Sequence, residues 1–584
     1  MKRYQFKKHI TGWNSVIILL SIIGFIICVA VLFPQVRQMI MNFAEQIVNK
    51  KASTYHIWTQ ALLSYAIGGI CFILFIDYLT LTDSGRTHSR KVTGALKECL
   101  SEIDFRSFVK PILLIFGVYL LGIFTIIRAN FSYMDDIGRT VTGYRGWYAG
   151  SRYVSEFLSV FVHGNTAVTD ISPLPQLLAI LVLSVSSVFL VYVIADRKLT
   201  VIRLLASLPL GLSPYFLECL SYKYDAPYMA LSILASIVPF LFINRKKAFL
   251  FSSVVSLLIM WMTYQSASGV YMLIVVILCF KDWNKNRKSV KEILSFFGMA
   301  ALSFCLAVLL FKIFLMRNEP IALHSASQIL SGIFKNLIDY IMIINSDFGI
   351  VWKVGIALVV LFFITRSVYQ SGRKRLLSFV ASVLVAGLSF FLSYGILYMV
   401  DAPMLLPRFL SGFGIFLAVL CIYVVSDYIK IATLTVLALN WCLFTFAFSY
   451  GNALADQSRY AEFRSAILLN DLSALFPERN REEMSFQFKN SIGSTPSIKN
   501  IAKHYPVIER LTGPKQFAEG NCWDIYYFLE YFNFSKYRKV NYPTIVSSED
   551  YVIDFDTLNL PVVLDSYYHT IRSDGNRTLI IFKH

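Results

Sequence analysis

The chain is constrained most by a series of apolar stretches, each about 20 residues long, that recur along its first 450 residues. A helix of that length crosses the roughly 30 Å of hydrocarbon in a bilayer. Hydrophobic residues make up 56% of the chain, whereas soluble domains have about 45–50%. We therefore predict an all-α polytopic membrane protein with about 13 transmembrane helices, within a range of 11–13. The predicted spans are 14–34, 59–81, 109–128, 173–195, 200–219, 227–244, 248–264, 266–280, 293–315, 349–366, 376–400, 407–427 and 431–450.

Basic residues predict the orientation of these helices. Alternate loops are rich in Lys and Arg, as at 245–247 and 373–375, and such loops remain in the cytoplasm. This pattern places the N-terminus inside, and it places the loop 129–172 and everything after residue 450 outside. The same loops account for the net charge of +18, so this charge does not indicate nucleic-acid binding.

The last part of the chain has a different composition. Polar and charged residues return after residue 450, and no further apolar run is long enough to cross a bilayer. We predict a transmembrane domain at 1–450 and a small extracytoplasmic α/β domain at 451–584. Helices are expected at 457–475 and 497–511, and a β-hairpin is expected around Ser573–Asn576, where Asp-Gly separates two apolar strands.

Two further outside segments, 35–51 and 325–345, carry apolar residues at helical spacing. Both are predicted to form helices in the plane of the membrane interface. Such a helix can guide a lipid tail or an acceptor into a site, but an ordinary connector is the more frequent explanation.

Two adjacent carboxylates, Asp135 and Asp136, follow the span 109–128 after a few residues. Their mutual repulsion can raise the pKa of one of them and suit it to work as a general base. Arg139, Arg145 and Arg152 follow in the same loop, and guanidinium groups make bidentate contacts with phosphate. The alternative is a solvated turn held by local Arg–Asp pairs, and the residues alone leave both explanations open.

A second polar cluster lies at the next outside turn and contains Glu218, Tyr222, Lys223, Tyr224 and Asp225. It is expected to share the outer face with Asp135 and Asp136. Aromatic residues at this depth often form only an interfacial belt, but three charged residues within eight positions favour a binding site. Tyr264 and Gln265 at the following outside turn are further candidates, as is Arg408 at the start of a span, where an arginine in isolation more often snorkels.

No outside segment has the clustered His and Cys residues of a zinc site. We therefore expect no metal and no cofactor. One hard cation on Asp135 and Asp136 remains an alternative, although the neighbouring arginines compete for these carboxylates.

Several motifs resemble the bacterial glucosyl transferase family of O-antigen modification, the enzymes of serotype conversion. The motifs are NFSYMDDIGRTVTGYRGW, SRYVSEFLSVF, DISPLPQLLAILVLSVSS and SPYFLECLSYKYDAPYMALS. The resemblance implies a fold of the membrane glycosyltransferase C (GT-C) class in the bacterial inner membrane, with the C-terminal domain in the periplasm. It implies undecaprenyl phosphate glucose as the donor and an O-antigen glycan as the acceptor. It also implies two partners in the pathway, an enzyme that makes the donor and a flippase.

By this resemblance, Asp135 or Asp136 is the base that activates the acceptor hydroxyl, and the anomeric carbon inverts. Asp135 is preferred, but the sequence leaves the choice between the two open. The chemistry of the other candidate residues suggests their roles in this reaction. The cations expected to hold the departing phosphate are Arg139, Arg145, Arg152, Lys223 and Arg408. The residues expected to contact sugar are Tyr144, Trp147, Glu218, Tyr222, Tyr224, Asp225, Tyr264 and Gln265.

Two alternatives stay open at this point. One is a transporter or flippase of a lipid-linked sugar, although such proteins usually have charges deep within the spans and internal repeats. The other is a GT-C enzyme that uses a different polyprenyl-phosphate hexose.

Overall fold

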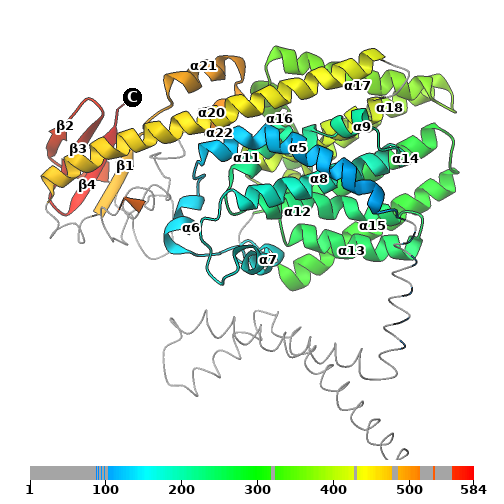
Figure 1. Cartoon of the computed structure of the whole chain (residues 1–584), viewed down its shortest axis with the longest axis horizontal. Coiled ribbons are helices and arrows are strands. Elements are labelled where there is room, and N and C mark those ends of the chain that lie inside the picture. The colour runs from blue at the N-terminus through cyan, green and yellow to red at the C-terminus, as the bar shows by residue number, and fades with distance from the viewer. Residues whose placement is uncertain are drawn as a thin grey trace, which may run out of the picture. The chain divides into compact units, whose positions relative to one another are not determined.

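The computed structural model describes residues 103–316, 322–425, 430–476, 485–512, 531–532 and 555–583, together with residues 87, 90, 94, 98 and 101. The predicted spans 14–34 and 59–81 and the amphipathic segment 35–51 lie outside the described residues. The chain divides into two compact units, Met1–Phe105 with Val308–Met316, and Arg106–Ala307 with Arg317–His584. The second unit holds every candidate site residue, and its helices and small sheet are labelled in Figure 1.

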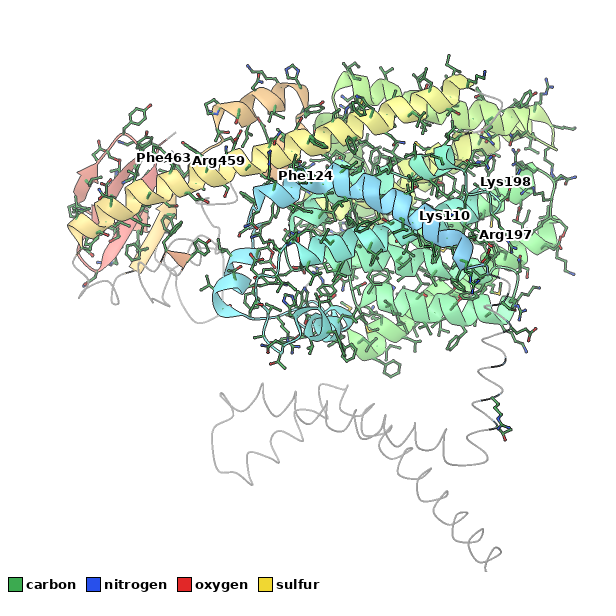
Figure 2. All side chains as sticks on the ribbon, in the orientation of Figure 1. Lys110, Phe124, Arg197, Lys198, Arg459 and Phe463 are labelled. Atoms are coloured by element: carbon green, nitrogen blue, oxygen red, sulfur yellow. The ribbon has the colours of Figure 1, made fainter. Side chains whose placement is uncertain are left out.

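The described residues contain nine helices that are long and apolar enough to cross a membrane. They are α5 (Arg106–Ala129), α8 (Leu174–Ile194), η2 and α14 (Gln265–Asn284), α15 and η3 (Val290–Leu315), α16 (Ile329–Asp347), α17 (Ile350–Tyr369), α18 (Arg375–Leu392), η5 and α19 (Pro407–Val424) and α20 (Lys430–Leu475). Many of their large apolar side chains are exposed, including Leu113 and Phe124 on α5, the latter labelled in Figure 2. Such faces are stable only against lipid, which supports the prediction of a polytopic membrane protein.

One predicted span, 200–219, is broken in the middle. Val201–Leu212, which contains α9 (Val201–Leu205) and α10 (Pro209–Leu212), is followed by α11 (Pro214–Ser221) at an angle of 63°. The break falls at Ser213, whose backbone is extended (φ −60°, ψ 144°). A proline disfavours helical geometry in the residue before it, so Pro214 ends one helix and begins the next. If this pair is one crossing, the described residues provide up to 10.

Three other predicted segments differ from the structure in length or role. The range 227–244 forms α12 (Ala226–Ile237) and η1 (Val238–Phe242), and 248–264 forms α13 (Lys246–Trp261), with 16 residues. Both are shorter than the nine helices named above, each of which has at least 18 residues. The segment 325–345, predicted to lie in the interface, forms α16, whose 19 residues are apolar enough to cross.

Close helix packing joins the C-terminal part of α5 to the middle of α20. A Cβ added to Gly451 would lie 2.5 Å from the carbonyl carbon of Thr125 and 2.6 Å from the amide nitrogen of Ile126. The hydroxyl of Thr125 donates to the carbonyl oxygen of Ala447 at 3.2 Å. Only glycine permits this approach, so Gly451 sets the position of α5 where the chain leaves it for the candidate site.

A four-stranded sheet with the order β1-β4-β3-β2 packs on the C-terminal part of α20 (Figure 1). The strands are β1 (Ser485–Lys489), β2 (Val562–Asp565), β3 (His569–Ser573) and β4 (Arg577–Phe582), and η8 (Phe555–Leu558) precedes β2. β4 pairs with β1 in parallel and with β3 in antiparallel fashion. The β3–β4 hairpin encloses Asp574 and Gly575, as its sequence predicted.

The predicted C-terminal helices form with one change. The segment 457–475 is the end of α20, which runs without a break across residue 450, so the domain boundary placed there stays a prediction. The segment 497–511 forms two helices, α21 (Pro496–His504) and α22 (Val507–Thr512). Pro506 separates them, because Tyr505 before it adopts a non-helical conformation (φ −130°, ψ 82°).

Candidate functional site

The chain leaves α5 at Ala129 and, after six intervening residues, enters the short helix α6 (Asp136–Thr142). Asn130 and Met134 in this turn have positive φ angles of 47° and 49°. These positions of positive φ let the chain turn tightly, so that Asp135 and Asp136 lie just beyond the C-terminal end of α5. After α6, α7 (Tyr153–His163) completes the helical part of the loop.

Asp136 is fully buried and ties two parts of the site together. Its Oδ2 accepts hydrogen bonds from the backbone N–H groups of Tyr133 and Lys223, both at 3.0 Å. Its Oδ1 is buried without a hydrogen-bond partner among the described residues. Burial, and then the charge of Asp135, hold the pKa of Asp136 well above its usual value, although the two backbone donors oppose this. These contacts make Asp136 a structural link between the loop and residues 222–225.

Asp135 is more accessible, with 24% of its side chain exposed. Its Oδ2 lies 3.0 Å from a terminal nitrogen of Arg139, one helical turn away. Burial raises the pKa of Asp135 above its usual value, and the Arg139 guanidinium is the largest influence that lowers it. Asp135 is therefore a reachable carboxylate whose basicity is increased by its surroundings, which is what a general base requires.

Arg139 bridges two carboxylates. Besides Asp135, its guanidinium lies 3.0 Å from Oδ2 of Asp225, and its carbon is 4.1 Å from the ring centroid of Trp147. The indole N–H of Trp147 donates to Oδ1 of Asp225. The Arg139 side chain is 6% exposed, so its charge is directed at the two carboxylates and the indole face.

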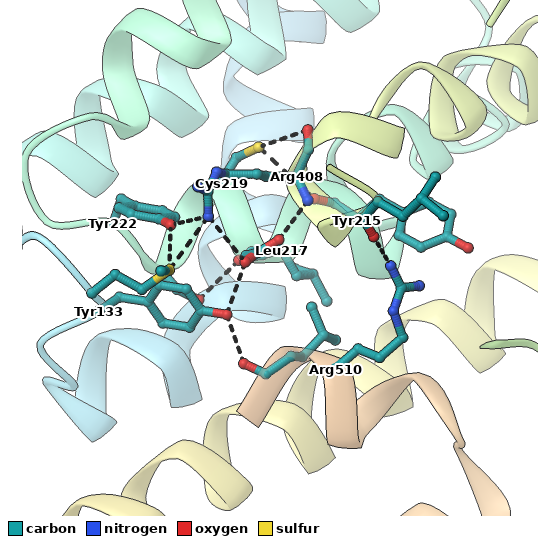
Figure 3. A network of polar contacts seen from close by, with 12 residues as sticks. Tyr133, Tyr215, Leu217, Cys219, Tyr222, Arg408 and Arg510 are labelled. Atoms are coloured by element: carbon teal, nitrogen blue, oxygen red, sulfur yellow. Dashed lines mark hydrogen bonds and ion pairs between the residues drawn. The ribbon is translucent and has the colours of Figure 1, made fainter. Parts of the chain in front are cut away.

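A second network joins Glu218, Tyr133, Tyr222 and Arg408 (Figure 3). Glu218 is fully buried and accepts from the Tyr133 hydroxyl at 3.0 Å and from the backbone N–H of Arg408. The Arg408 guanidinium donates to the Tyr222 hydroxyl and lies 3.6 Å from Glu218. Arg408 thus has a packing role in this network, rather than simply snorkelling at a span end, and its side chain is 16% exposed.

The C-terminal part of the chain reaches this second network. The carbonyl oxygen of Leu511 on α22 accepts from the Tyr133 hydroxyl at 2.7 Å. Arg510 pairs with Asp347 and donates to the carbonyl oxygen of Leu405. Figure 3 shows Arg510 beside Tyr215, whereas Arg408 contacts Tyr222. These contacts were not predicted from the sequence, because nothing local in α22 signals a partner hundreds of residues away.

The C-terminal sheet also contacts the acidic loop. Ile137, which follows Asp136 directly, is buried in the same apolar cluster as Ala461 on α20, Phe486 on β1 and Ile580 on β4. α6 is therefore packed partly by the C-terminal sheet and its supporting helix.

Lys223 is buried, and its ammonium pairs with Asp170 at 2.9 Å. Asp170 is also held by Ser172, whose backbone N–H and hydroxyl both donate to Oδ1. Asp170 was not among the predicted residues, although it stands in the DISPLP motif that carried the family resemblance.

Three of the predicted sugar-contacting aromatic residues, Trp147, Tyr144 and Tyr224, lie around Arg139. The ring centroids of Tyr144 and Tyr224 lie 5.6 and 6.0 Å from its guanidinium carbon. The Tyr224 hydroxyl is 3.0 Å from that of Thr140, and its ring stacks on His163 with centroids 5.7 Å apart. Burial raises the pKa values of both tyrosines to about 12, so they are neutral hydrogen-bonding groups at neutral pH.

Some predicted site residues have partners elsewhere in the loop. Arg145 pairs with Glu156 at 3.0 Å, and the Arg152 guanidinium lies 5.1 Å from the ring centroid of Tyr264. The side chain of Gln265 donates to the carbonyl oxygen of Gly150 at 3.0 Å. These contacts fasten the loop to neighbouring elements and do not join Asp135.

In the part of the chain that the structure describes, no group of three or more His, Cys, Asp or Glu side chains is arranged to hold a metal ion. Asp135 and Asp225 instead face the guanidinium of Arg139. The absence of a metal requirement stays a prediction.

Comparisons with known proteins agree with the motifs. The sequence model of a family described as "Glucosyl transferase GtrII" matches residues 124–425, which is just over half of the chain. The match includes all the predicted site residues and stops before α20. An uncharacterized 55.3 kDa protein in the gtrB 5' region of Salmonella phage P22 is 27% identical over 169 residues. That alignment covers 28% of this chain and 34% of the phage protein, about a third of its length. None of the solved structures matches the chain.

Proposed function

The chain belongs to the GtrII glucosyl transferase family, and from that membership we propose that it transfers glucose from undecaprenyl phosphate glucose to an O-antigen or related surface glycan. The family and the apolar helices make the protein a membrane glycosyltransferase. The lipid-linked donor, the glycan acceptor, the inverting course and the location on the outer face of a bacterial inner membrane are parts of the proposal.

The observation that carries the proposal is the placement of Asp135. It is a partly exposed carboxylate with a raised pKa, it lies just beyond the outer end of an apolar helix, and it is oriented by Arg139. A sugar hydroxyl that approaches this carboxylate can lose its proton as it attacks the anomeric carbon. The new bond forms between the acceptor oxygen and the anomeric carbon, and the bond from that carbon to the phosphate oxygen breaks. The proton remains on Asp135, and polyprenyl phosphate leaves with the bonding electrons.

We propose roles for the cations that differ in part from the expected ones. Arg139 is engaged by Asp135 and Asp225, so in this proposal it positions the base rather than holding the phosphate. Arg408 and Lys223 remain as donors for the phosphate, whose negative charge grows as the bond breaks. Trp147, Tyr144 and Tyr224 offer ring faces around the same place.

The test replaces Asp135 and Asp136 separately with Asn in purified protein reconstituted in vesicles, supplied with the lipid-linked donor and an O-antigen acceptor. Loss of a general base typically lowers the rate about 10²- to 10⁴-fold, and we expect this of Asp135→Asn with folding retained. Asp136→Asn is expected to lower the unfolding temperature as well, because its amide would be buried without a matching partner. The control is Asp401→Asn, an outside carboxylate that is 60% exposed and paired only with His324 in the described structure.

Mass spectrometry of the product decides between outcomes. Normal hexose addition by folded Asp135→Asn protein would show that Asp135 is not the base. Movement of the lipid-linked sugar across the vesicle membrane without a new glycosidic bond would show a transporter. A product that carries a hexose other than glucose would overturn the donor assignment.

A further inference from the structure

A cavity of about 140 Å³ lies where the outer ends of α5, α8 and α11 meet α20. Its apolar side is formed by residues of α5 and α20, among them Ile127 and Leu454. Its polar side includes Asn130, Gln176 and Lys223. The cavity is thus amphipathic and lies at the level where α5 ends, which is the boundary between the predicted span and the outer loop.

Two of its polar side chains are more than nine-tenths buried. Gln176, in the first turn of α8, is 4% exposed, and its Oε1 is buried without a hydrogen-bond partner in the described structure. Lys223 is also 4% exposed. A buried acceptor without a partner is destabilising, so a donor supplied by a bound molecule gives Gln176 a physical reason to face this space.

The ammonium group of Lys223 has unused hydrogen-bonding capacity. Lysine carries three N–H donors, and among the described residues the ammonium group of Lys223 donates only to Asp170, at 2.9 Å. Asp170 is fixed in turn by the backbone N–H of Ser172 at 2.9 Å and by its hydroxyl at 2.6 Å. Asp170 therefore holds the ammonium group in place and leaves two N–H donors for an acceptor in the cavity.

We propose that this cavity binds the phosphate–sugar junction of a polyprenyl phosphate sugar, with phosphate oxygen on Lys223 and a sugar hydroxyl donating to Gln176. This proposal rests on the proposed function and adds the place where the lipid-linked donor enters. A phosphate oxygen accepts hydrogen bonds from the ammonium group, and a sugar hydroxyl donates one to the amide oxygen. A lipid chain packs against the apolar side. A molecule that combines all three is the head of a lipid-linked monophosphosugar.

The cavity is coupled to the candidate base by a single short segment. The backbone N–H of Lys223 donates to Asp136, the neighbour of Asp135, while its side chain lines the cavity. Phe124, three residues before the cavity-lining Ile127 on α5 and labelled in Figure 2, is 54% exposed, so this part of α5 offers apolar surface to a lipid chain.

The test measures lipid binding separately from glycosyl transfer. Full-length protein in detergent is mixed with undecaprenyl phosphate, with undecaprenyl phosphate glucose or with uncharged undecaprenol, and complexes are counted by native mass spectrometry. We expect Lys223→Met to weaken the binding of undecaprenyl phosphate and of undecaprenyl phosphate glucose about tenfold or more. Gln176→Leu should weaken the binding of undecaprenyl phosphate glucose only. It should not lower the unfolding temperature, because it removes an acceptor that has no protein partner in the described structure. The control is Lys110→Met, an exposed lysine near the inner end of α5.

Lys223→Met leaves Asp170 without its cation, so its folding is checked by thermal unfolding. If it does not fold, Lys223→Met combined with Asp170→Asn removes both charges and is measured instead. Binding of the phosphate lipids at wild-type strength by the folded variants would overturn the cavity assignment, even where the wild-type protein transfers glucose. Equal binding of undecaprenol and undecaprenyl phosphate by the wild-type protein would also overturn it. A wild-type protein that binds the lipids as expected and forms no glycoside would contradict the proposed function instead.

Discussion

Arg139→Met should move the acid limb of the pH–rate profile to higher pH. In the proposed reaction Asp135 acts as a base, so activity is lost as the pH falls through its pKa and this carboxylate takes up a proton. Arg139 lies 3.0 Å from Asp135 and is the largest influence that lowers its pKa. Removing the guanidinium leaves burial unopposed by this charge, and the pKa of Asp135 must rise.

The size of the shift follows from the geometry. An opposite charge at this separation lowers a carboxyl pKa by about 1–3 units, so the acid limb should move up by a similar amount. Above the new pKa the variant should regain activity, limited by the poorer orientation of Asp135. Stability should also fall, by about 3–5 kcal/mol, because Asp225 is 4% exposed and would lose its cation.

The measurement is initial rate against pH for the purified enzyme, at a temperature well below the unfolding midpoint of the variant. Arg139→Lys is the matched control, since it keeps the charge but lacks the fork that reaches both carboxylates, and its acid limb should move less. An acid limb that stays in place in folded Arg139→Met protein, or that moves equally in Arg139→Lys, would refute the assignment of Asp135 as the base controlled by Arg139.

Two further predictions concern the supports of the site. Gly451→Ala should lower the free energy of unfolding by about 1–3 kcal/mol and reduce activity, because the new Cβ would overlap the backbone at Thr125. The control is Gly117→Ala on α5, where nothing lies within 4 Å of the added Cβ. This control should leave the unfolding temperature in detergent unchanged or higher. Arg510→Met should lower the stability by about 3–5 kcal/mol, because it strands the buried carboxylate of Asp347, and Arg510→Met combined with Asp347→Asn should recover most of the loss. Equal unfolding temperatures for the single and double Arg510 variants would show that the ion pair contributes nothing.

The helical part of the fold was predictable because its signal is local. A run of about 20 apolar residues has one stable structure in a bilayer, so α5, α8, α15 and α17 lie close to their predicted ranges. The differences arose where length alone does not decide. Pro214 divides a run that looks continuous, and α16 is apolar enough to cross although its amphipathic pattern indicated an interfacial helix.

The candidate site was predictable in its residue types but not in its pairings. The sequence placed Asp135, Arg139 and Asp225 on one face, because alternating loops meet on the same side of a membrane. It could not show that Asp136 would be buried as a link between two loops, since that depends on backbone donors from Tyr133 and Lys223. The roles proposed for these residues in catalysis stay predictions.

The hydrogen bond from Tyr133 to the carbonyl of Leu511 has a consequence for biosynthesis. Its partners are 378 residues apart, and the apolar cluster around Ile137 includes strand residues that are made later still. At about 5–20 residues per second, a ribosome needs roughly 20–75 s to supply the second partner after the first. Throughout that time the acidic loop is already translated but lacks these two sets of contacts. A chain still being synthesised therefore has no finished site, and the site can be assembled only when nearly the whole protein has been made.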